Sequence, residues 1–290
     1  MNTTSRTSID LPPSSSSAGT FNWDSPFNLC LSFHRKILTW LIPLGVWRYG
    51  PFGPSVFRIG PRMMVKSDVR YSEVANMQHI ASNTSIPVPR VRDYFVSNGR
   101  SYLVMDYIDA PTLLGVWDTL SPLEKQSILL QLQEHLVQLR QLTPPHAGHV
   151  EAAEGLPCWD PRLRSTPFGP FTSVKDFHEF LGHDYMRTAE NCREYRAVFE
   201  ECARRSYKTM FTHGDLAPRN ILVKDAKIVG LIDWEVSGWY PEYWEYVRLR
   251  NAFIKLLPED FVEGLLEPMT PYPTETKAEA ALSELLEGRY

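Results

Sequence analysis

The stretch that decides the fold is FTHGDLAPRNILV over residues 211–223, and IDWE follows it at residues 232–235. Asp215 precedes Asn220 by five positions and Asp233 by eighteen. The apolar residues 221–223 and 228–232 flank a polar turn at 225–227, a pattern typical of two short strands. We therefore expect a hairpin that brings Asn220 and Asp233 back near one another.

This spacing fits the chemistry of phosphoryl transfer. That reaction needs a carboxylate to orient the attacking hydroxyl and accept its proton, and oxygen ligands to hold Mg²⁺ on the nucleotide phosphates. Protein kinases supply these groups with H-R-D-x-x-x-x-N and then D-F-G, and here HGD, Asn220 and DWE fill the same positions. Asp and Asn also cap helices and shape turns, but the combined spacing with a strand on each side favours a catalytic site.

With these motifs the chain resembles the aminoglycoside phosphotransferase and choline kinase group, the small-molecule branch of the kinase-like fold. The paired H-G-D-x-x-x-x-N and I-D-W-E motifs are the hallmark of that group, and GWYPEYWEY at residues 238–246 is similar to a fungal phosphotransferase-like subgroup. The resemblance extends over about residues 45–255. It implies an α+β, bilobal protein-kinase-like fold with a small β-rich N-terminal lobe and a larger helical C-terminal lobe.

The resemblance also implies roles for individual residues. Asp215 would be the catalytic base, and Asn220 and Asp233 would bind Mg²⁺. His213 would support the catalytic loop, and Glu245 falls where the group often has an acidic residue on a helix that braces this loop. The implied activity is transfer of the γ-phosphate of ATP or GTP to a hydroxyl of a small molecule.

The N-terminal part of the chain contains candidates for nucleotide binding. Kinase-like folds need a strand lysine on the phosphates, held by a helix carboxylate. Lys66 ends an apolar strand, and Glu73 follows seven residues later. An exposed lysine at the end of a strand is ordinary by itself. Together with the motifs at residues 211–223 and 232–235, however, the spacing favours a Lys66–Glu73 pair. Met105, Asp106 and Tyr107 fall at the hinge between the lobes, where backbone groups would bind the adenine edge.

One departure keeps a second interpretation open. No G-x-G-x-x-G loop is present, and the nearby prolines lack the N–H groups that could cradle phosphates. The glycines and prolines concerned are Gly50, Gly53, Gly60, Pro51, Pro54 and Pro61. The chain could therefore be a pseudokinase that binds a metabolite or a partner with little turnover. A protein kinase is disfavoured, because no A-P-E motif or activation loop follows Asp233.

Three zones divide the chain. Residues 1–20 are rich in Ser and Thr and predict a disordered tail. Residues 21–108 form the nucleotide-binding lobe, with an apolar helix at 37–47 broken by Pro43, and then strand, strand, helix, strand, strand. The expected strands and helix are 56–59, 63–66, 72–81, 91–96 and 101–108, with turns at Gly60-Pro61 and Asn98-Gly99.

Residues 109–290 form the helical lobe with the catalytic loop, the metal site and the substrate site. Ser121, Pro122 and Glu124 predict a capped helix start, and residues 143–170 predict a Pro-rich surface loop that could be a substrate lid or a passive loop. Further helices are expected at 177–185, 190–207, 244–257 and 277–286.

The acceptor cannot be identified from the sequence. A cationic acceptor would favour acidic or aromatic surroundings, and both kinds of residue are available. The acidic candidates are Asp160, Asp176, Glu179, Asp184, Glu235 and Glu242, and the aromatic ones are Trp234, Trp239, Tyr240, Tyr243 and Trp244. The aromatic residues could form a cage for a quaternary amine, but a place in the hydrophobic core is favoured.

Composition excludes several other classes. The 290 residues carry a net charge of −4, so the basic excess of a nucleic-acid-binding protein is absent. Four cysteines without a C-x-x-C pair suggest reduced thiols. The apolar run 37–47 is too short to span a membrane and is expected to pack on the protein, so we expect a cytoplasmic location. His146 and His149 form an H-x-x-H pair, but a metal site needs further ligands and we expect none nearby in the sequence, so we expect no metal there.

Overall fold

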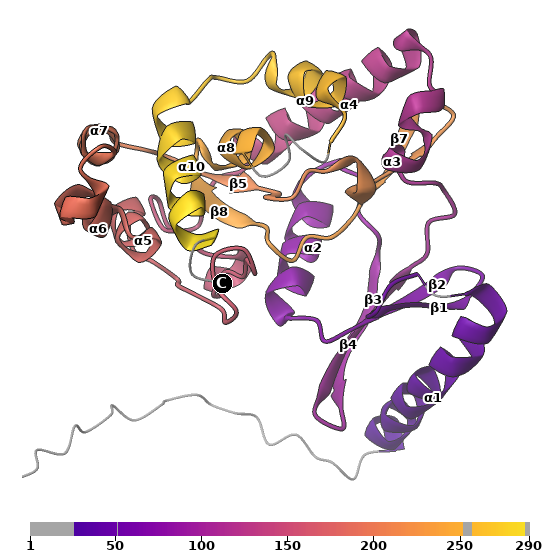
Figure 1. The fold of residues 1–290 in the computed structure, drawn as a ribbon. Helices are drawn as coiled ribbons and strands as arrows, with labels where there is room; N and C mark the ends of the chain where they lie inside the picture. The colour runs from indigo at the N-terminus through magenta and orange to yellow at the C-terminus, as the bar shows by residue number, and fades with distance from the viewer. Residues whose placement is uncertain (1–25, 51, 252–256, 288–290) are drawn as a thin grey trace, which may run out of the picture.

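The fold is a small antiparallel sheet followed by a larger helical part, as predicted (Figure 1). The computed structural model describes residues 26–50, 52–251 and 257–287; the expected tail at 1–20 lies outside them. The sheet has the order β1-β2-β4-β3. Its strands are β1 (Val56–Gly60), β2 (Met63–Ser67), β3 (Val91–Ser97) and β4 (Arg100–Asp106).

Both predicted hairpins of the sheet are present. Pro61 and Arg62 alone connect β1 to β2, and Asn98 and Gly99 connect β3 to β4. Asn98 and Gly99 have φ of 52° and 74°, which is the backbone that a two-residue hairpin turn requires at both central positions. β4 ends at Asp106, two residues before the predicted end.

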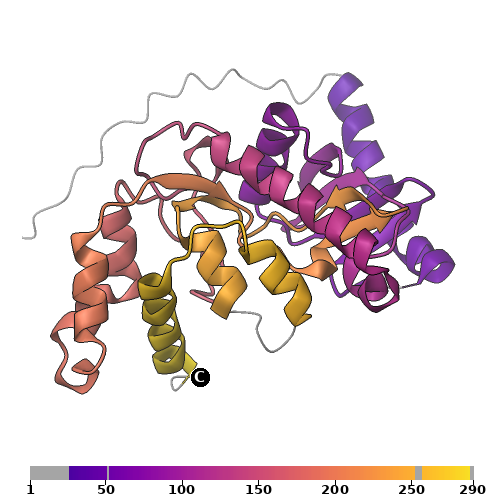
Figure 2. The same ribbon diagram turned by 90° about the horizontal axis from the view of Figure 1, so that it is seen from above.

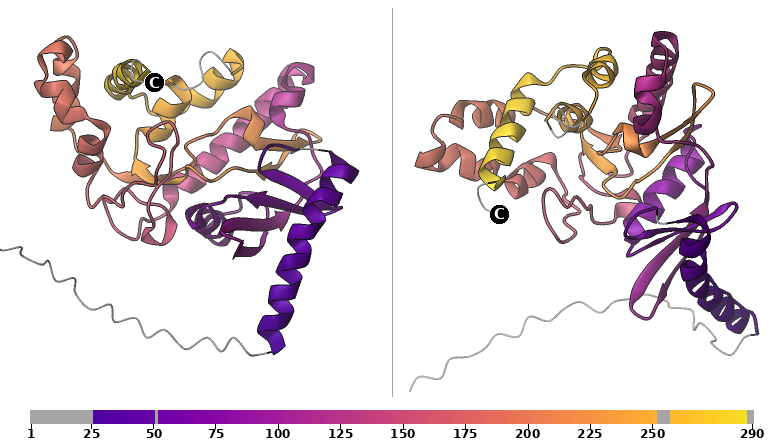
Figure 3. Two further views of the ribbon diagram at one scale, coloured as in Figure 1. Left: turned by 60° about the horizontal axis from the view of Figure 1, so that its bottom comes forward. Right: turned by 45° about the vertical axis from the view of Figure 1, so that its right-hand side comes forward.

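A long helix, α1 (Pro26–Tyr49), runs beside the sheet (Figure 3). Leu38 is buried against Val65, Phe95 and Val104 of the sheet, so the helix packs on the protein as predicted. The predicted break at Pro43 is wrong, because Pro43 lies inside the helix: packing on both sides of it outweighs the single backbone hydrogen bond that a proline removes. No helix among the described residues has the length and apolar character needed to cross a membrane.

Helix α2 (Tyr71–Asn83) lies between the sheet and the helical part (Figure 1). The side chain of Asn76, on this helix, is fully buried, and its Nδ2 donates to the carbonyl oxygens of Trp234 and Ser237 at 3.2 and 2.8 Å. The Asn76 amide oxygen accepts from the backbone N–H of Ala153 at 2.9 Å. One side chain therefore ties α2 to the helical part of the chain.

The helical part begins with α3 and the capped helix α4, whose capping box joins Ser121 and Glu124 as predicted. The expected helix at 177–185 is two helices, because Gly182 has a left-handed φ of 94°. Only part of the expected helix at 190–207 is α-helical, and that part is α7. Helix α9 was not predicted. The helices are α3 (Leu113–Val116), α4 (Pro122–Gln141), α5 (Val174–Leu181), α6 (His183–Thr188), α7 (Arg196–Arg204), α8 (Trp244–Asn251), α9 (Glu259–Leu266) and α10 (Pro273–Glu287).

Two small antiparallel pairs of strands lie among these helices (Figure 2). The predicted pair is β6 (Ile221–Lys224) with β7 (Lys227–Leu231), and the pair β5 (Thr209–Thr212) with β8 (Gly238–Pro241) was not predicted. The aromatic residues around β8 are exposed by 1% or less, so they form the core and not a cage. These residues are Trp234, Trp239, Tyr240, Tyr243 and Trp244.

Candidate active site

The β6–β7 hairpin brings the two predicted metal ligands together. Asn220 directly precedes β6 and Asp233 follows β7, and the strands pair with Ile221 opposite Leu231. The backbone N–H of Ile232 donates to the carbonyl oxygen of Asn220 at 2.9 Å. The predicted return of the chain is therefore confirmed.

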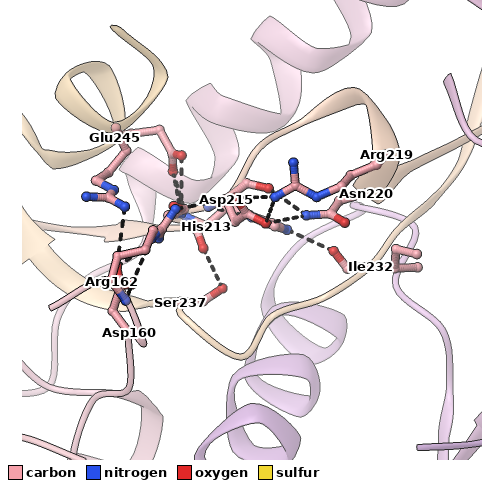
Figure 4. A network of polar contacts seen from close by, with 11 residues as sticks. Asp160, Arg162, His213, Asp215, Arg219, Asn220, Ile232, Ser237 and Glu245 are labelled. Carbon is pink, nitrogen blue, oxygen red and sulfur yellow. Dashed lines mark hydrogen bonds and ion pairs between the residues drawn. The ribbon is translucent and has the colours of Figure 1, made fainter. Parts of the chain in front are cut away.

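Asp215 lies in the loop after β5, against Asn220 (Figure 4). The amide nitrogen of Asn220 donates to the backbone oxygen and to Oδ2 of Asp215, both at 2.8 Å. Because this nitrogen is fixed on Asp215, the amide oxygen of Asn220 points away from it. Asn220 and Asp233 both line a cleft between the sheet and the helical part of the chain. Amide and carboxylate oxygens of this kind are suitable ligands for Mg²⁺.

Two arginines that the sequence analysis missed hold the Asp215 carboxylate. Arg219 Nη2 lies 2.9 and 2.7 Å from its oxygens, and Arg162 Nη1 lies 3.4 Å from Oδ1. Arg162 is itself held by Asp160 through contacts of 2.7 and 2.8 Å (Figure 4). Arg219 stands next to Asn220 inside the quoted motif and could have been noticed, whereas Arg162 belongs to the 143–170 loop and has no local signal.

Two of the acidic residues that the sequence analysis considered for a cationic acceptor are already ion-paired. The buried Asp160 pairs with Arg162 and lies 3.8 Å from Arg248, and Glu235, another expected acidic residue, contacts Lys66 at 3.3 Å. The 143–170 loop places Arg162 on Asp215, so this loop takes part in the site.

The loop that carries Asp215 is braced by a buried glutamate from α8. Glu245 accepts from the backbone N–H groups of His213 at 2.6 Å and Gly214 at 3.2 Å. Burial raises the pKa of Glu245 to about 7, and the two N–H donors lower it. This contact matches the bracing position that the sequence analysis assigned to Glu245.

His213 connects the same loop to the strand end at β7. Burial lowers the pKa of His213, so the neutral imidazole is favoured. Its Nε2 lies 3.2 Å from the carbonyl oxygen of Ile232, and its Nδ1 lies 3.3 Å from the backbone N–H of Asp215. A ring that donates through Nε2 and accepts at Nδ1 satisfies both contacts, and it couples Asp215 to the residue preceding Asp233.

Lys66 joins the sheet to the helical part. Its ammonium contacts both oxygens of Glu73 at 2.9 and 3.0 Å and Oδ1 of Asp233 at 2.8 Å, so the predicted Lys66–Glu73 pair is formed. Burial disfavours the charge of Lys66, but Glu73, Asp233 and Glu235 outweigh it and raise its pKa. Burial raises the pKa of Glu73 to about 7, and the charge of Lys66 lowers it.

A cleft of about 350 Å³ lies between the sheet and the helical part. It brings together seven of the predicted residues, which come from both parts: Lys66, Glu73, Met105, Asp106, Tyr107, Asn220 and Asp233. The backbone N–H groups of Asp106 and Tyr107 already donate to the carbonyl oxygens of Arg90 and Arg62 at 3.0 and 3.1 Å. An adenine ring would therefore use other atoms of the hinge than these two donors.

The sequence profile of the phosphotransferase enzyme family (APH) matches residues 46–275. No curated protein sequence matches the chain significantly. Among solved structures, the apo form of a thermostable mutant of aminoglycoside phosphotransferase APH(4)-Ia has 14% identity and a TM-score of 0.57, over 83% of this chain and 88% of that chain.

Two further neighbours are ternary complexes. One, of a thermostable APH(4)-Ia mutant with AMP-PNP and hygromycin B, has 14% identity and a TM-score of 0.58, covering 84% of this chain and 88% of that chain. The other, of APH(2″)-IIa with streptomycin and ATP, has 15% identity and a TM-score of 0.52, covering 81% and 80%. The family match over most of the length, together with this shared fold, shows that the chain belongs to the phosphotransferase enzyme family.

Proposed function

We propose that this phosphotransferase transfers the γ-phosphate of ATP, or of GTP, to a hydroxyl of a small metabolite in a Mg²⁺-dependent reaction. The observation that carries the proposal is the contact of Lys66 with both Glu73 and Asp233 across the cleft that Asn220 also lines. Phosphoryl transfer depends on positioning and on electrostatic stabilisation. These residues supply a cation for the phosphates and oxygen ligands for a metal in one place.

In this proposal residues 21–108 hold the nucleotide and residues 109–290 supply the catalytic loop. Lys66 binds the phosphates, and Asn220 and Asp233 would hold Mg²⁺, which would neutralise the phosphate charge. Asp215 orients the acceptor hydroxyl and accepts its proton. Arg219 lines the cleft beside Asn220 and is placed to stabilise negative charge on the transferred group.

The charges around Asp215 bear on the class of the acceptor. Two of the structural neighbours are complexes with the aminoglycosides hygromycin B and streptomycin. Around Asp215, Arg162 and Arg219 contact its carboxylate and Arg248 lies 3.8 Å from Asp160, while Glu245 holds the backbone of the same loop. Three arginines therefore face three carboxylates, and these charges favour neither a cationic nor an anionic hydroxyl compound.

A specific observation favours the alternative of a pseudokinase. The connection between β1 and β2, where kinases bind phosphates with a glycine-rich loop, is only Pro61 and Arg62. Pro61 has no N–H to donate, so Arg62 is the one residue of this connection with a backbone N–H that a phosphate could use. Weak phosphate binding at this turn would leave a metabolite-binding protein with little turnover.

A thermal-shift titration with ATP and GTP, with and without Mg²⁺, distinguishes the active phosphotransferase from the pseudokinase. A ligand at 100 times its Kd stabilises the folded protein by about 2.7 kcal/mol. The melting temperature of wild type should show a Mg²⁺-dependent shift, and Asp233→Asn should lose this shift. Asparagine is the suitable replacement because Asp233 has a positive φ of 67°, which asparagine tolerates. The matched control is Asp225→Asn in the exposed β6–β7 turn, where φ is 51°, and it should behave as wild type.

Turnover is tested with Asp215→Asn. We expect this variant to bind nucleotide nearly as wild type and to lose most phosphate transfer, once an acceptor is found by screening hydroxyl compounds. Turnover at the wild-type rate would exclude Asp215 as the base. Absence of any nucleotide shift from a folded sample would instead support the pseudokinase alternative.

A further inference from the structure

A cluster of side chains of the kinds that bind metals lies in the loop that follows α4, outside the set of residues that line the cleft. His146 Nδ1 lies 2.8 Å from Oε1 of Glu151, and His149 Nδ1 lies 3.7 Å from Oε2 of the same carboxylate. One ligand atom from each residue lies within 4.8 Å of the others. The two imidazole rings are stacked, with their centroids 4.9 Å apart.

The carboxylate at the centre of this cluster is buried and its position is fixed by the backbone. The Glu151 side chain is 2% exposed, while those of His146 and His149 are 55% and 29% exposed. The backbone of Glu151 pairs with Trp239 of β8 through hydrogen bonds of 3.2 and 2.7 Å. A Cβ on Gly238 would lie 2.7 Å from the carbonyl oxygen of Glu151, so the chain cannot easily shift there.

Both oxygens of this carboxylate face an imidazole nitrogen, Oε1 that of His146 and Oε2 that of His149. A divalent cation could be bound by the carboxylate and the two imidazoles together, because one ligand atom from each of the three residues already lies within 4.8 Å of the others. Because both histidines reach the surface, the remaining coordination positions would be open to water.

We propose that His146, His149 and Glu151 form a binding site for Zn²⁺ or a similar divalent transition metal. Two imidazole nitrogens and one carboxylate are a ligand set that zinc uses with a water in the fourth position. Mg²⁺ prefers oxygen ligands, so this site is distinct in chemistry from the proposed nucleotide site. The sequence analysis set the histidine pair aside, and the third ligand that it lacked is Glu151, two positions after His149.

The site is connected to α2 through the same loop. Ala153, two residues after Glu151, donates its backbone N–H to Asn76 at 2.9 Å. A metal that fixes residues 146–151 would therefore also stabilise the loop that holds the helix of Glu73. We expect the metal to raise the stability of the folded chain, since it binds the assembled site and binds the unfolded chain less tightly.

The test uses the full chain, freed of metal with a chelator and studied without nucleotide. Co²⁺ is titrated while its visible absorption is followed, because tetrahedral coordination gives intense bands, and Zn²⁺ is then added in competition. Wild type should bind one equivalent of Co²⁺, Zn²⁺ should displace it, and excess Mg²⁺ should not. His149→Gln and Glu151→Gln should each weaken binding by at least about tenfold, the scale at which ligand surroundings affect metal sites.

The matched control is His135→Gln on α4, which removes a partly buried histidine outside the cluster. It should bind Co²⁺ as wild type does. The metal-free thermal melts of the two cluster variants identify any loss of fold, and His149, whose side chain is 29% exposed against 2% for Glu151, is the safer substitution of the two. Absence of saturable Co²⁺ binding by wild type, or equal binding by wild type and folded His149→Gln, would overturn the proposal.

Discussion

Glu245 provides a direct test of how the catalytic loop is held. Glu245→Ala removes the carboxylate that accepts from the N–H groups of His213 and Gly214. Each buried donor left without a partner costs about 1–3 kcal/mol, so the free energy of unfolding should fall by roughly 2–6 kcal/mol. Glu245→Gln keeps an acceptor oxygen and should lose less than half as much.

The same residue should make stability depend on pH. Burial raises the pKa of Glu245 from 4.5 to about 7, so the folded state binds this proton more tightly than the unfolded chain does. The stabilisation is therefore complete below the unfolded pKa and is lost as the pH rises through about 7. This shift corresponds to about 3 kcal/mol at most.

The assay is urea unfolding at about pH 5 and about pH 8, compared between wild type, Glu245→Gln and the exposed control Glu267→Gln. Wild type and the control should lose more stability than Glu245→Gln as the pH rises. Glu73, whose pKa burial also raises to about 7, is present in all three proteins and cancels in the comparison. An equal loss in Glu245→Gln and wild type would refute the reasoning.

Three further substitutions test other contacts. Glu73→Gln removes the charge that holds Lys66 and should weaken nucleotide binding about tenfold by calorimetry; unchanged affinity would contradict the role of this pair. Gly214→Ala should lower the free energy of unfolding in urea by at least about 1–2 kcal/mol, because φ is 78° and a Cβ would lie 3.0 Å from the carbonyl oxygen of Val236. Ser121→Ala removes the cap of α4 and should cost about 1 kcal/mol in the same assay; a loss near zero would show that the cap is not needed.

The elements that were predicted correctly are those with local signals. Asn98 and Gly99 define a turn by their own backbone preferences, and Ser121 with Glu124 defines a helix start within four residues. The pairing of β5 with β8 was missed because it joins Thr209 to Pro241, and such short strands, buried on both faces, show no alternation.

The same distinction applies to the candidate site. Asp215, Asn220 and Asp233 were singled out because their spacing matches that of kinase motifs, and the hairpin that returns Asp233 to Asn220 has a local signal. The contact of Lys66 with Asp233 joins residues 167 positions apart, and it was not predicted, because only the Lys66–Glu73 pair was expected from the resemblance to a family. Arg162 was missed because no local sequence pattern indicates that it contacts Asp215, which lies far along the chain.

The placement of the tryptophans gives α1 an optical signal of its own. Trp40 and Trp47 of this helix are 84% and 80% exposed, whereas Trp117, Trp234 and Trp244 are almost fully buried. Aqueous quenchers such as iodide reach the first group and not the second, and solvent contact shifts indole emission to longer wavelengths. Among the tryptophans that the structure describes, quenchable, red-shifted fluorescence therefore comes from α1 and protected, blue-shifted fluorescence comes from the core. Because Trp40 and Trp47 are exposed already, opening of the core changes mainly the protected fraction, so it can be followed separately from α1 in one sample.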